Sequence, residues 1–250
     1  MRKSLTKFAF TASIALALAF TLSCSGGDDG DEGSNSGGSG GRGGNPNIKY
    51  GSLTYEGETY KTVKIGELTW MAENLNYAVD GSRCYEDKPA NCKKYGSLYD
   101  WATAMGIDTI YNGKEWDGSD VKHRGICPPD WHIPSVDEWY ALIESVGGGR
   151  ASIWAKKLKA TSDWKDDGNG TDDFGFTALP GGYYNHAFGN FFEVGISGSW
   201  HTASKRIAKE SERYAAIMWL YYSEVIGGEL VGANNANSKR DGLSIRCVQD

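Results

Sequence analysis

Residues Gly125–Trp139 read GICPPDWHIPSVDEW, and this stretch carries the clearest structural signals of the chain. It combines Cys127, a proline pair and a Trp-His step with a complete signal for the start of a helix. Ser135 is placed to be the N-cap, and Glu138 is placed to complete a capping box. The apolar residues that follow recur at helical spacing, and Gly147–Gly149 ends the predicted helix.

Short strands and helices are predicted on both sides of this stretch. The elements expected before it are a hairpin, a strand and a helix: Leu53–Tyr55 with Thr59–Ile65, Leu68–Met71, and Ser97–Met105. Those expected after it are a short helix, three strands and a turn: Ser152–Ala160, Phe174–Leu179, Tyr214–Tyr222, Leu243–Val248, and Pro180–Tyr183. Helices in the first half and short strands among many loops indicate an α+β domain.

The N-terminus is predicted to be an export signal covering residues 1–23. Three cations precede the apolar run Phe8–Leu22, which is shorter than the ~20 residues of a membrane-spanning helix. Leu22-Ser23-Cys24 resembles the lipobox of bacterial lipoproteins, so Cys24 is predicted to be acylated. The lipobox favours Leu where this chain has Thr21. The alternative is an ordinary signal peptide with a chance cysteine.

Residues 24–47 are rich in Gly, Ser and Asp and are predicted to be a flexible linker to a single domain, residues 48–250. The acidic cluster Asp28–Glu32 resembles the export tags that send lipoproteins to the outer face of the outer membrane. The expected location is therefore the cell surface, with the lipid bilayer as a partner. A merely solubilising linker is the alternative.

The charge of the chain argues against nucleic acid as a partner. Loss of residues 1–23 removes three cations and no acids, which changes the formal net charge from −6 to −9. A domain this acidic, without a basic stripe, is a poor binder of nucleic acid.

The cysteines are expected to form two disulfides. The chain has five cysteines, and assigning Cys24 to the lipid leaves Cys84, Cys92, Cys127 and Cys247. An even set in an exported protein indicates disulfides, and four cysteines allow three pairings. Cys84 and Cys92 are close in the sequence and are expected to pair with each other. Cys127 and Cys247 would then form a disulfide that joins the last strand to the centre of the chain. A zinc site is the alternative, although no C-x-x-C spacing occurs.

Six stretches of the chain together resemble the Fibrobacter succinogenes major paralogous domain. They cover nearly all of Tyr55–Asp250 in the right order: Thr69–Leu75, Cys92–Trp101, Cys127–Trp139, Asp172–Gly182, Gly198–Ala203 and Ser244–Val248. The resemblance implies an exported, often lipid-anchored module. It implies no known catalytic residues.

A second likeness concerns the fold. Trp131–Leu142 resembles the helix start of formylglycine-generating enzymes, and Ser244–Val248 resembles the terminal strand of their architecture. Those enzymes are C-type-lectin-like, and their chain ends pair in one small sheet. The resemblance implies an α+β, C-type-lectin-like domain with two or three helices, short antiparallel strands and long loops. The reactive cysteine pair of these enzymes has no counterpart here.

No catalytic constellation is evident in the sequence. The four histidines are scattered, and His132 and His201 follow tryptophans, where imidazoles usually tie loops together. There is no G-x-S-x-G, P-loop or H-E-x-x-H motif. A non-enzymatic protein is therefore expected. The alternatives are an enzyme acting on extracellular or cell-wall polymer, or a purely structural envelope protein.

One acidic stretch, Asp166–Asp173, could bind a cation. Oxygen ligands alternate with glycines there, which suits Ca²⁺ near Asp166, Asp172 and Asp173, and no other cofactor is expected. An EF-hand loop would need glycine in place of Asp172 and a later glutamate. A solvated acidic turn is the competing interpretation.

The candidate ligand-binding residues lie in a segment rich in glycine and asparagine, which predicts an exposed loop. They are Tyr183, Tyr184, Asn185, His186, Phe188, Phe191 and Phe192. Flat aromatic faces beside polar side chains suit a glycan, and they also suit a protein contact. The sequence therefore predicts a surface-anchored binding module that contacts glycan or protein, with a role of the adhesion type.

Overall fold

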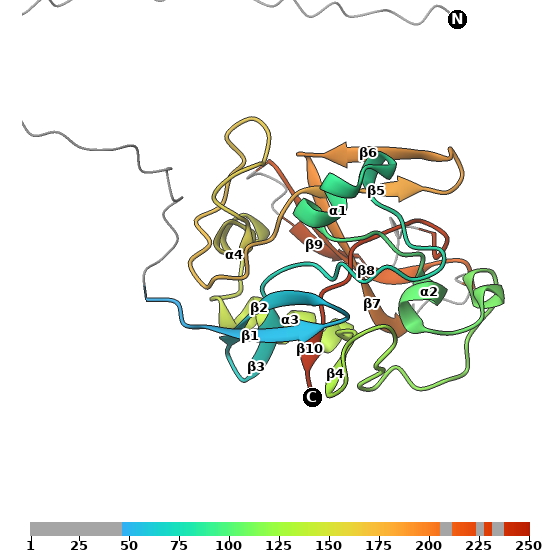
Figure 1. Cartoon of the computed structure of the whole chain (residues 1–250). Coiled ribbons are helices and arrows are strands. Elements are labelled where there is room, and N and C mark those ends of the chain that lie inside the picture. Colours follow the sequence, from blue (N-terminus) through green and yellow to red (C-terminus); the bar gives the residue numbers. More distant parts are fainter. Residues whose placement is uncertain (1–46, 206–211, 224–227, 232–237) are drawn as a thin grey trace, which may run out of the picture. The chain divides into compact units, whose positions relative to one another are not determined.

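The computed structural model describes residues 47–205, 212–223, 228–231 and 238–250. The predicted signal peptide, Cys24 and nearly all of the linker lie outside the described residues. In the part described, no helix is long and apolar enough to cross a membrane. Figure 1 shows two sheets with short helices around them.

The first sheet brings the two ends of the described chain together. Its strands, in spatial order, are β1 (Tyr50–Tyr55), β2 (Glu58–Ile65), β3 (Leu68–Met71), β10 (Val248–Gln249) and β4 (Trp131–His132), all paired antiparallel. β1 and β2 form the predicted hairpin, whose turn residues Glu56 and Gly57 both have positive φ, as a tight two-residue turn requires. Because β10 lies between β3 and β4, the N-terminal hairpin and the chain end share one sheet.

The second sheet is formed by the later strands. Its order is β6 (Asn190–Val194), β5 (Gly181–Asn185), β7 (Ser197–Lys205), β8 (Ala215–Tyr221) and β9 (Gly228–Val231). Its pairs are antiparallel except β5 with β7, which is parallel. Met218 and Leu220 of β8 enter the main core, while Ile217 lies on the other face with Leu243. The prediction of a strand here that is covered on both faces is confirmed.

The described residues contain four α-helices, where two or three were predicted. They are α1 (Pro89–Tyr95), α2 (Trp101–Met105), α3 (Val136–Ser145) and α4 (Ala151–Leu158), with 3₁₀ turns at Tyr85–Asp87 (η1) and Thr109–Asn112 (η2). α3 begins as predicted, because Ser135 and Glu138 form the complete capping box. The unpredicted helix is α1, and Pro89 at its first position is the sequence signal for it.

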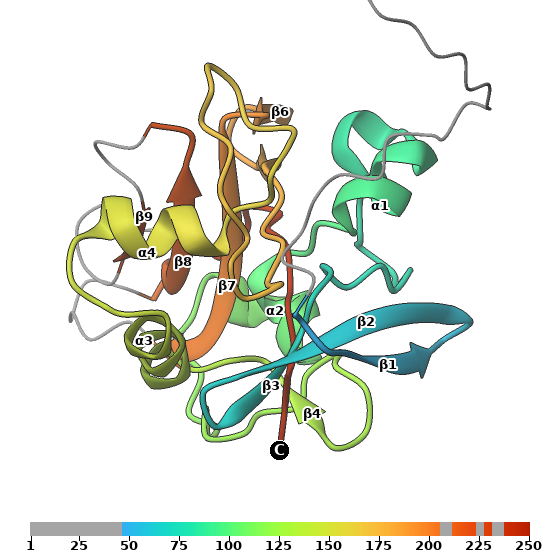
Figure 2. The ribbon, with the colours of Figure 1, turned by 90° about the vertical axis from the view of Figure 1, so that its left-hand side faces the viewer.

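The main core lies among the two sheets and helices α3 and α4, and aromatic rings dominate it. Trp70 of β3, Trp139 of α3, Phe176 and Trp200 of β7 are fully buried, with neighbouring ring centroids 4.9–6.1 Å apart. Figure 2 shows α3 and α4 beside β7 and β8, and Trp154 of α4 belongs to the same core. Large buried rings of this kind supply much of the apolar area that a loop-rich domain can bury.

Both predicted disulfides are present. Cys127 is bonded to Cys247 across 120 residues of sequence, and Cys84 is bonded to Cys92. Cys127 and Cys247 are fully buried in a second core cluster under α2. The C-terminal segment is thus joined covalently to the loop before β4.

The helix predicted over Ser97–Met105 is wrong in its first half, because α2 begins at Trp101. The carboxylate of Asp100 accepts a hydrogen bond from the third backbone N–H of the helix, which fixes the start there. Leu98 is extended instead, and its backbone exchanges hydrogen bonds of 2.8 and 2.9 Å with Arg83.

The strand predicted over Phe174–Leu179 is also wrong. Thr177 has φ +53°, which interrupts an extended chain, and side-chain nitrogens of Arg246 donate to the carbonyls of Phe176 and Thr177 in place of a neighbouring strand. Only Ala178 pairs, through a single bridge with Lys159.

Two further predictions change at the edges of the second sheet. Pro180–Tyr183 is not a turn, because Gly181 is already the first residue of β5. The strand expected over Leu243–Val248 is reduced to β10 and to single bridges at Leu243 and Ser244. These bridges leave the segment buried between other elements, so it is fixed in place without forming a continuous ladder.

Candidate functional site

The aromatic segment Tyr183–Phe192, predicted to be an exposed loop, is a β-hairpin. Strands β5 and β6 pair Tyr183 with Phe192 and Tyr184 with Phe191, and residues 186–189 form the turn. Directly paired residues share a face of a ladder, and successive residues alternate between its faces. The rings are therefore divided into two sets on opposite faces of the hairpin, whose turn lies on the side away from α4 in Figure 1.

The first set continues toward η1. The ring centroids of Tyr184 and Phe191 are 5.1 Å apart, and Tyr85 lies 5.2 Å from Phe191. The guanidinium of Arg83 is 4.5 Å from the centroid of Tyr184, a cation–π contact. Four planar groups thus follow one another across this face.

The second set of rings belongs partly to the hydrophobic core. Tyr183 stacks on Phe192 at 5.9 Å and also packs against Ile217 and Leu243. Burial raises the pKa of Tyr183, with smaller effects from acidic neighbours in the same direction. Phe188, at the turn, is 78% exposed and makes an edge contact with the ring of Phe192. The prediction of an exposed loop is wrong, because the four rings on the two strands are half-buried and Tyr183 packs against Leu243 near the end of the chain.

The two polar candidates have different roles. The side-chain oxygen of Asn185 accepts a hydrogen bond from the backbone of Phe188 at 3.1 Å, so it shapes the turn. The backbone N–H of His186 donates to the buried Asp241 at 2.8 Å, and its side chain is exposed. The hairpin is therefore tied to the segment that precedes Gly242.

A cavity of about 230 Å³ opens beside the first ring set. It is lined by Gly81, Arg83, Leu98, Asp100, Tyr184, His186, Arg240 and Gly242. Tyr184 and His186 are the two predicted site residues that it includes. Sequence reasoning missed Arg83 and Arg240, which lie far apart in the chain. They line the same cavity because Arg83 pairs with Leu98 and Tyr184 pairs with Gly242.

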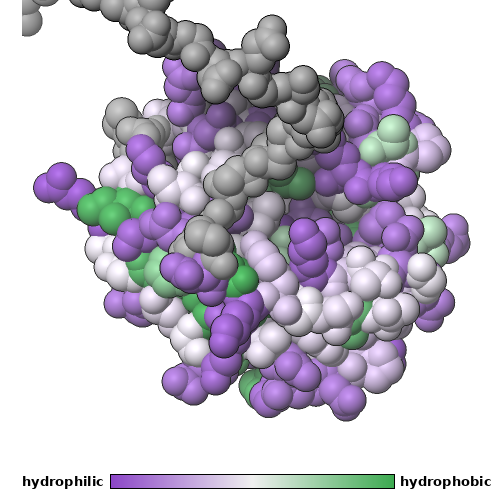
Figure 3. Space-filling view, turned by 60° about the vertical axis from the view of Figure 1, so that its left-hand side comes forward, coloured by the Kyte–Doolittle hydropathy of each residue, from purple (hydrophilic) through white to green (hydrophobic). Residues whose placement is uncertain are grey.

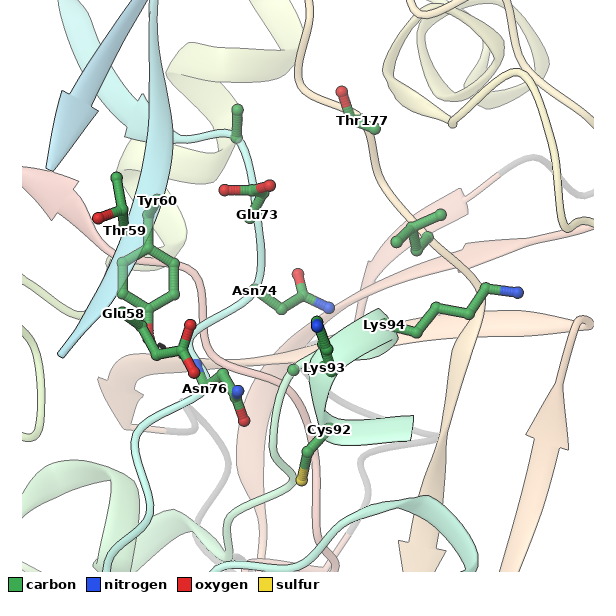
Figure 4. Close-up of a pocket in the computed structure, with 13 residues that line it drawn as sticks. Glu58, Thr59, Tyr60, Glu73, Asn74, Asn76, Cys92, Lys93, Lys94 and Thr177 are labelled. Carbon is green, nitrogen blue, oxygen red and sulfur yellow. Dashed lines mark hydrogen bonds between the residues drawn. The ribbon is translucent and has the colours of Figure 1, made fainter. Parts of the chain in front are cut away.

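A second cavity, of about 180 Å³, is shown in Figure 4. Three of the stretches that resemble the known family meet there and contribute Glu73, Lys94 and Thr177, among others. Most of its polar groups already have partners in the protein. Lys94 pairs with Asp163 at 2.7 Å, and Glu73 accepts the backbone N–H of Lys61 at 2.7 Å.

Asn74, at the base of this second cavity, has a structural role. Its oxygen accepts from the side chains of Trp200 at 2.9 Å and Arg246 at 2.7 Å. Its nitrogen donates to the backbone of Tyr95 and the hydroxyl of Ser244. With every hydrogen-bonding position engaged, Asn74 links β3, α1, β7 and the C-terminal segment, and has no capacity left for a ligand.

Arg246 is the buried charge at the centre of this network. It is 1% exposed, and its guanidinium also lies 4.2 Å from the ring of Phe176. Burial lowers its pKa to about 9, and the charges of Asp172 and Glu73 act in the opposite direction. Its acceptors are carbonyl and amide oxygens, so the fold satisfies this charge by hydrogen bonds rather than by a direct ion pair.

The acidic stretch Asp166–Asp173 does not gather its carboxylates. Asp172 is buried and accepts from the backbone and hydroxyl of Thr177 at 2.7 and 2.8 Å. Burial raises its pKa, although those hydrogen bonds lower it. Asp166 and Asp173 are exposed. Among the residues that the structure describes, no group of three His, Cys, Asp or Glu is placed to hold a metal.

The two histidines next to tryptophans do tie segments together. His132 bonds to Glu138 of α3 at 2.7 Å and to Asp250 at 2.5 Å. His201 bonds to the backbone oxygen of Tyr99 at 2.9 Å, and complete burial lowers its pKa to about 4. His201 is therefore neutral at physiological pH, and neither imidazole lines one of the two cavities.

The face that lies on the left in Figure 1 is turned forward in Figure 3. Hydrophobic residues appear there as small patches separated by hydrophilic ones. Large contiguous apolar patches mark contact surfaces. The part of this side that is visible in Figure 3 therefore presents none of this kind.

Comparison with known proteins gives one result. The model of the Fibrobacter succinogenes major domain matches residues 63–249, which is most of the chain. No curated protein and no solved structure gives a significant match. The matched residues include both disulfides and every strand of the two sheets except β1 and the start of β2. They also include the lining of both cavities, except where the start of β2 lines the second cavity. The chain belongs to the Fibrobacter succinogenes major domain family.

Proposed function

We propose that the chain is a non-catalytic glycan-binding module displayed at the cell surface, with a role in adhesion. The observation that carries the proposal is Tyr184, which belongs both to the ring series of the hairpin and to the lining of the adjoining cavity. Aromatic faces bind the apolar faces of sugars, and a few placed polar groups fix their orientation. At about 230 Å³, the cavity is below the ~300–1,000 Å³ of pockets that enclose drug-sized ligands. It suits one unit of a longer chain.

Binding without hydrolysis is supported by the carboxyl groups at the cavity. Glycoside hydrolysis usually needs a pair of carboxyl groups flanking the scissile bond. Among the residues that the structure describes, Asp100 is the only acid that lines the cavity, and its oxygens accept hydrogen bonds from Thr103 and Asn112. This carboxylate caps a helix and is not available to act on a substrate.

The proposal includes a C-type-lectin-like architecture. Its support is the sheet shared by the two ends of the described chain, with β10 between β3 and β4. The bond between Cys127 and Cys247 holds this end to the loop before β4. The second sheet and the hairpin β5–β6 would then form the variable part that carries the binding face.

The same proposal places the domain at the outer face of the outer membrane. Acylated Cys24 would hold it through the linker of residues 24–47. A flexible chain of this length has an end-to-end distance of roughly 25–30 Å. The hairpin would be free to meet glycans on neighbouring surfaces.

Replacement of one ring tests the proposal. The change Tyr184→Ala removes the aromatic group at the cavity, and we expect glycan binding to weaken by at least about tenfold, since aromatic anchors carry much of the energy of an interface. Binding of the full chain to an array of polysaccharides is the measurement. Tyr140→Ala is the matched control, because Tyr140 is an exposed tyrosine on α3. Equal binding by the two variants would contradict the proposal.

A further inference from the structure

Two arginines line the cavity, whereas Asp100 is the one acid among the described residues that line it. Arg83, His186 and Arg240 line it, and all three are exposed at the surface. Within the described part of the chain, neither arginine forms an ion pair. Guanidinium groups are fully charged at neutral pH and present planar sets of donors.

The carboxylate of Asp100 does not neutralise these arginines directly. Its Oδ1 accepts from the backbone of Thr103 at 2.9 Å and from the side chain of Asn112 at 2.7 Å. Its Oδ2 accepts from the hydroxyl of Thr103 at 2.9 Å. The groups that remain free to bind a ligand are therefore the two guanidinium groups and the imidazole.

This local excess of positive charge is opposite in sign to the formal net charge of the whole chain, which is −6. The acidic surface as a whole repels anions, so an anionic ligand must gain its affinity from specific contacts. Arginine provides such contacts, because its planar fork matches a carboxylate with two parallel hydrogen bonds. Two arginines on one cavity can bind a carboxylate from two sides.

The backbone that carries these side chains is ordered before a ligand arrives. Arg83 is fixed by two hydrogen bonds with Leu98, and it precedes the bonded Cys84. Tyr184 exchanges hydrogen bonds of 2.9 and 2.8 Å with Gly242. The backbone N–H of Arg240 donates to the hydroxyl of Ser238 at 3.2 Å. A site whose backbone is ordered in advance loses less entropy on binding.

We infer that the ligand of this cavity is an acidic glycan whose uronic-acid carboxylate is held between Arg83 and Arg240, with its sugar ring at the edge of Tyr184, since Arg83 already lies over the face of that ring. The inference rests on the proposed function and adds the chemical class of the ligand. His186 also lines the cavity, and its imidazole can hydrogen-bond to a sugar hydroxyl.

The test compares two ligands that differ only in charge. An oligogalacturonate and its methyl ester have the same sugar rings, and calorimetry with the full chain measures the affinity of each. We expect the acid to bind at least tenfold more tightly than the ester, with an advantage that shrinks as salt is added. Arg83→Gln and Arg240→Gln should each reduce this preference severalfold, and the double change should abolish it.

Two further variants exclude trivial explanations. Arg83→Lys keeps the charge but not the planar fork, and it should recover only part of the preference. Arg150→Gln removes an exposed arginine beside α4 that makes no capping contact, and it should change nothing. Thermal unfolding of each variant checks that the fold is intact.

The outcomes separate this inference from the proposal beneath it. Equal affinity for acid and ester would overturn the inference and leave glycan binding in place. Absence of binding to both acidic and neutral glycans would overturn both. Tighter binding of a sulfated neutral backbone than of the uronate would contradict the assignment to a carboxylate.

Discussion

The side chain of Asn74 is 7% exposed and joins four parts of the chain through its amide. Gly96 packs against it so closely that an added Cβ would lie 2.6 Å from the Cβ of Asn74. Its partner Arg246 carries a buried charge that forms no ion pair with a carboxylate in the described part of the chain. A buried charge without hydrogen-bond acceptors costs several kcal/mol. The free energy of unfolding therefore depends strongly on the residue that accepts hydrogen bonds from this charge.

Removing this acceptor should be strongly destabilising. Asn74→Ala removes the oxygen that accepts hydrogen bonds from two nitrogens of the Arg246 guanidinium, and we expect the free energy of unfolding to fall by about 3–5 kcal/mol. Urea denaturation measures the loss. Asn76→Ala is the control, because Asn76 lines the same cavity and its oxygen accepts one hydrogen bond, from Ser97, worth about 1 kcal/mol. Equal losses in the two variants would contradict the structural role of Asn74.

At the scale of elements, His132 connects three of them. It lies on β4 and bonds to Glu138 at the start of α3 and to Asp250 after β10. Burial alone would lower the pKa of His132, but the hydrogen bonds and charges of its two partners outweigh this and raise it above 6.5. Burial likewise acts to raise the pKa of Glu138, and its bonds to His132 and Ser135 lower it below 4.5.

These shifts predict a pH window for stability. The contribution of His132 is complete below about pH 6.5 and is lost as pH rises through its raised pKa, whereas that of Glu138 is lost as pH falls through its lowered pKa. The free energy of unfolding of the wild type should exceed that of His132→Gln at both pH values. This difference should be about 1–2 kcal/mol larger near pH 5.5 than near pH 8.5. Chemical denaturation at both pH values measures the difference. A difference between the two proteins that is independent of pH would count against the ion-paired imidazole.

At the scale of the whole molecule, the bond between Cys127 and Cys247 closes a loop of 120 residues. It holds β10 in the first sheet, where this strand pairs through only three residue pairs. Replacing both cysteines by Ala should lower the free energy of unfolding by about 3–5 kcal/mol, because the unfolded chain regains the entropy of a long loop. Cys84→Ala with Cys92→Ala is the comparison, and its eight-residue separation should cost less. A larger loss in the comparison pair would contradict this.

Local signals were the ones that the sequence could reveal. The capping box of Ser135 and Glu138 lies within four residues, so its prediction required no knowledge of the fold. Cysteine parity indicated both disulfides. The helix expected from Ser97 failed because Leu98 pairs with Arg83, and a contact between segments overrides an apolar pattern.

The candidate site could be predicted from the sequence only in part, for the same reason. The composition around Tyr184 indicated a surface segment of aromatic and polar residues, and this residue does line a cavity. The half-buried position of Tyr183 depends on Ile217 and Leu243, which pack against it from distant parts of the sequence. Arg83 and Arg240 carry no local signal at all, because only the tertiary structure places them together.

The most direct test is a crystal structure of the full chain bound to an acidic oligosaccharide. We predict that the ligand occupies the cavity between Arg83 and Arg240, with a sugar ring against Tyr184 and a carboxylate within hydrogen-bonding distance of a guanidinium. A ligand bound instead in the cavity beside Asn74, or at a face remote from the hairpin β5–β6, would contradict the account.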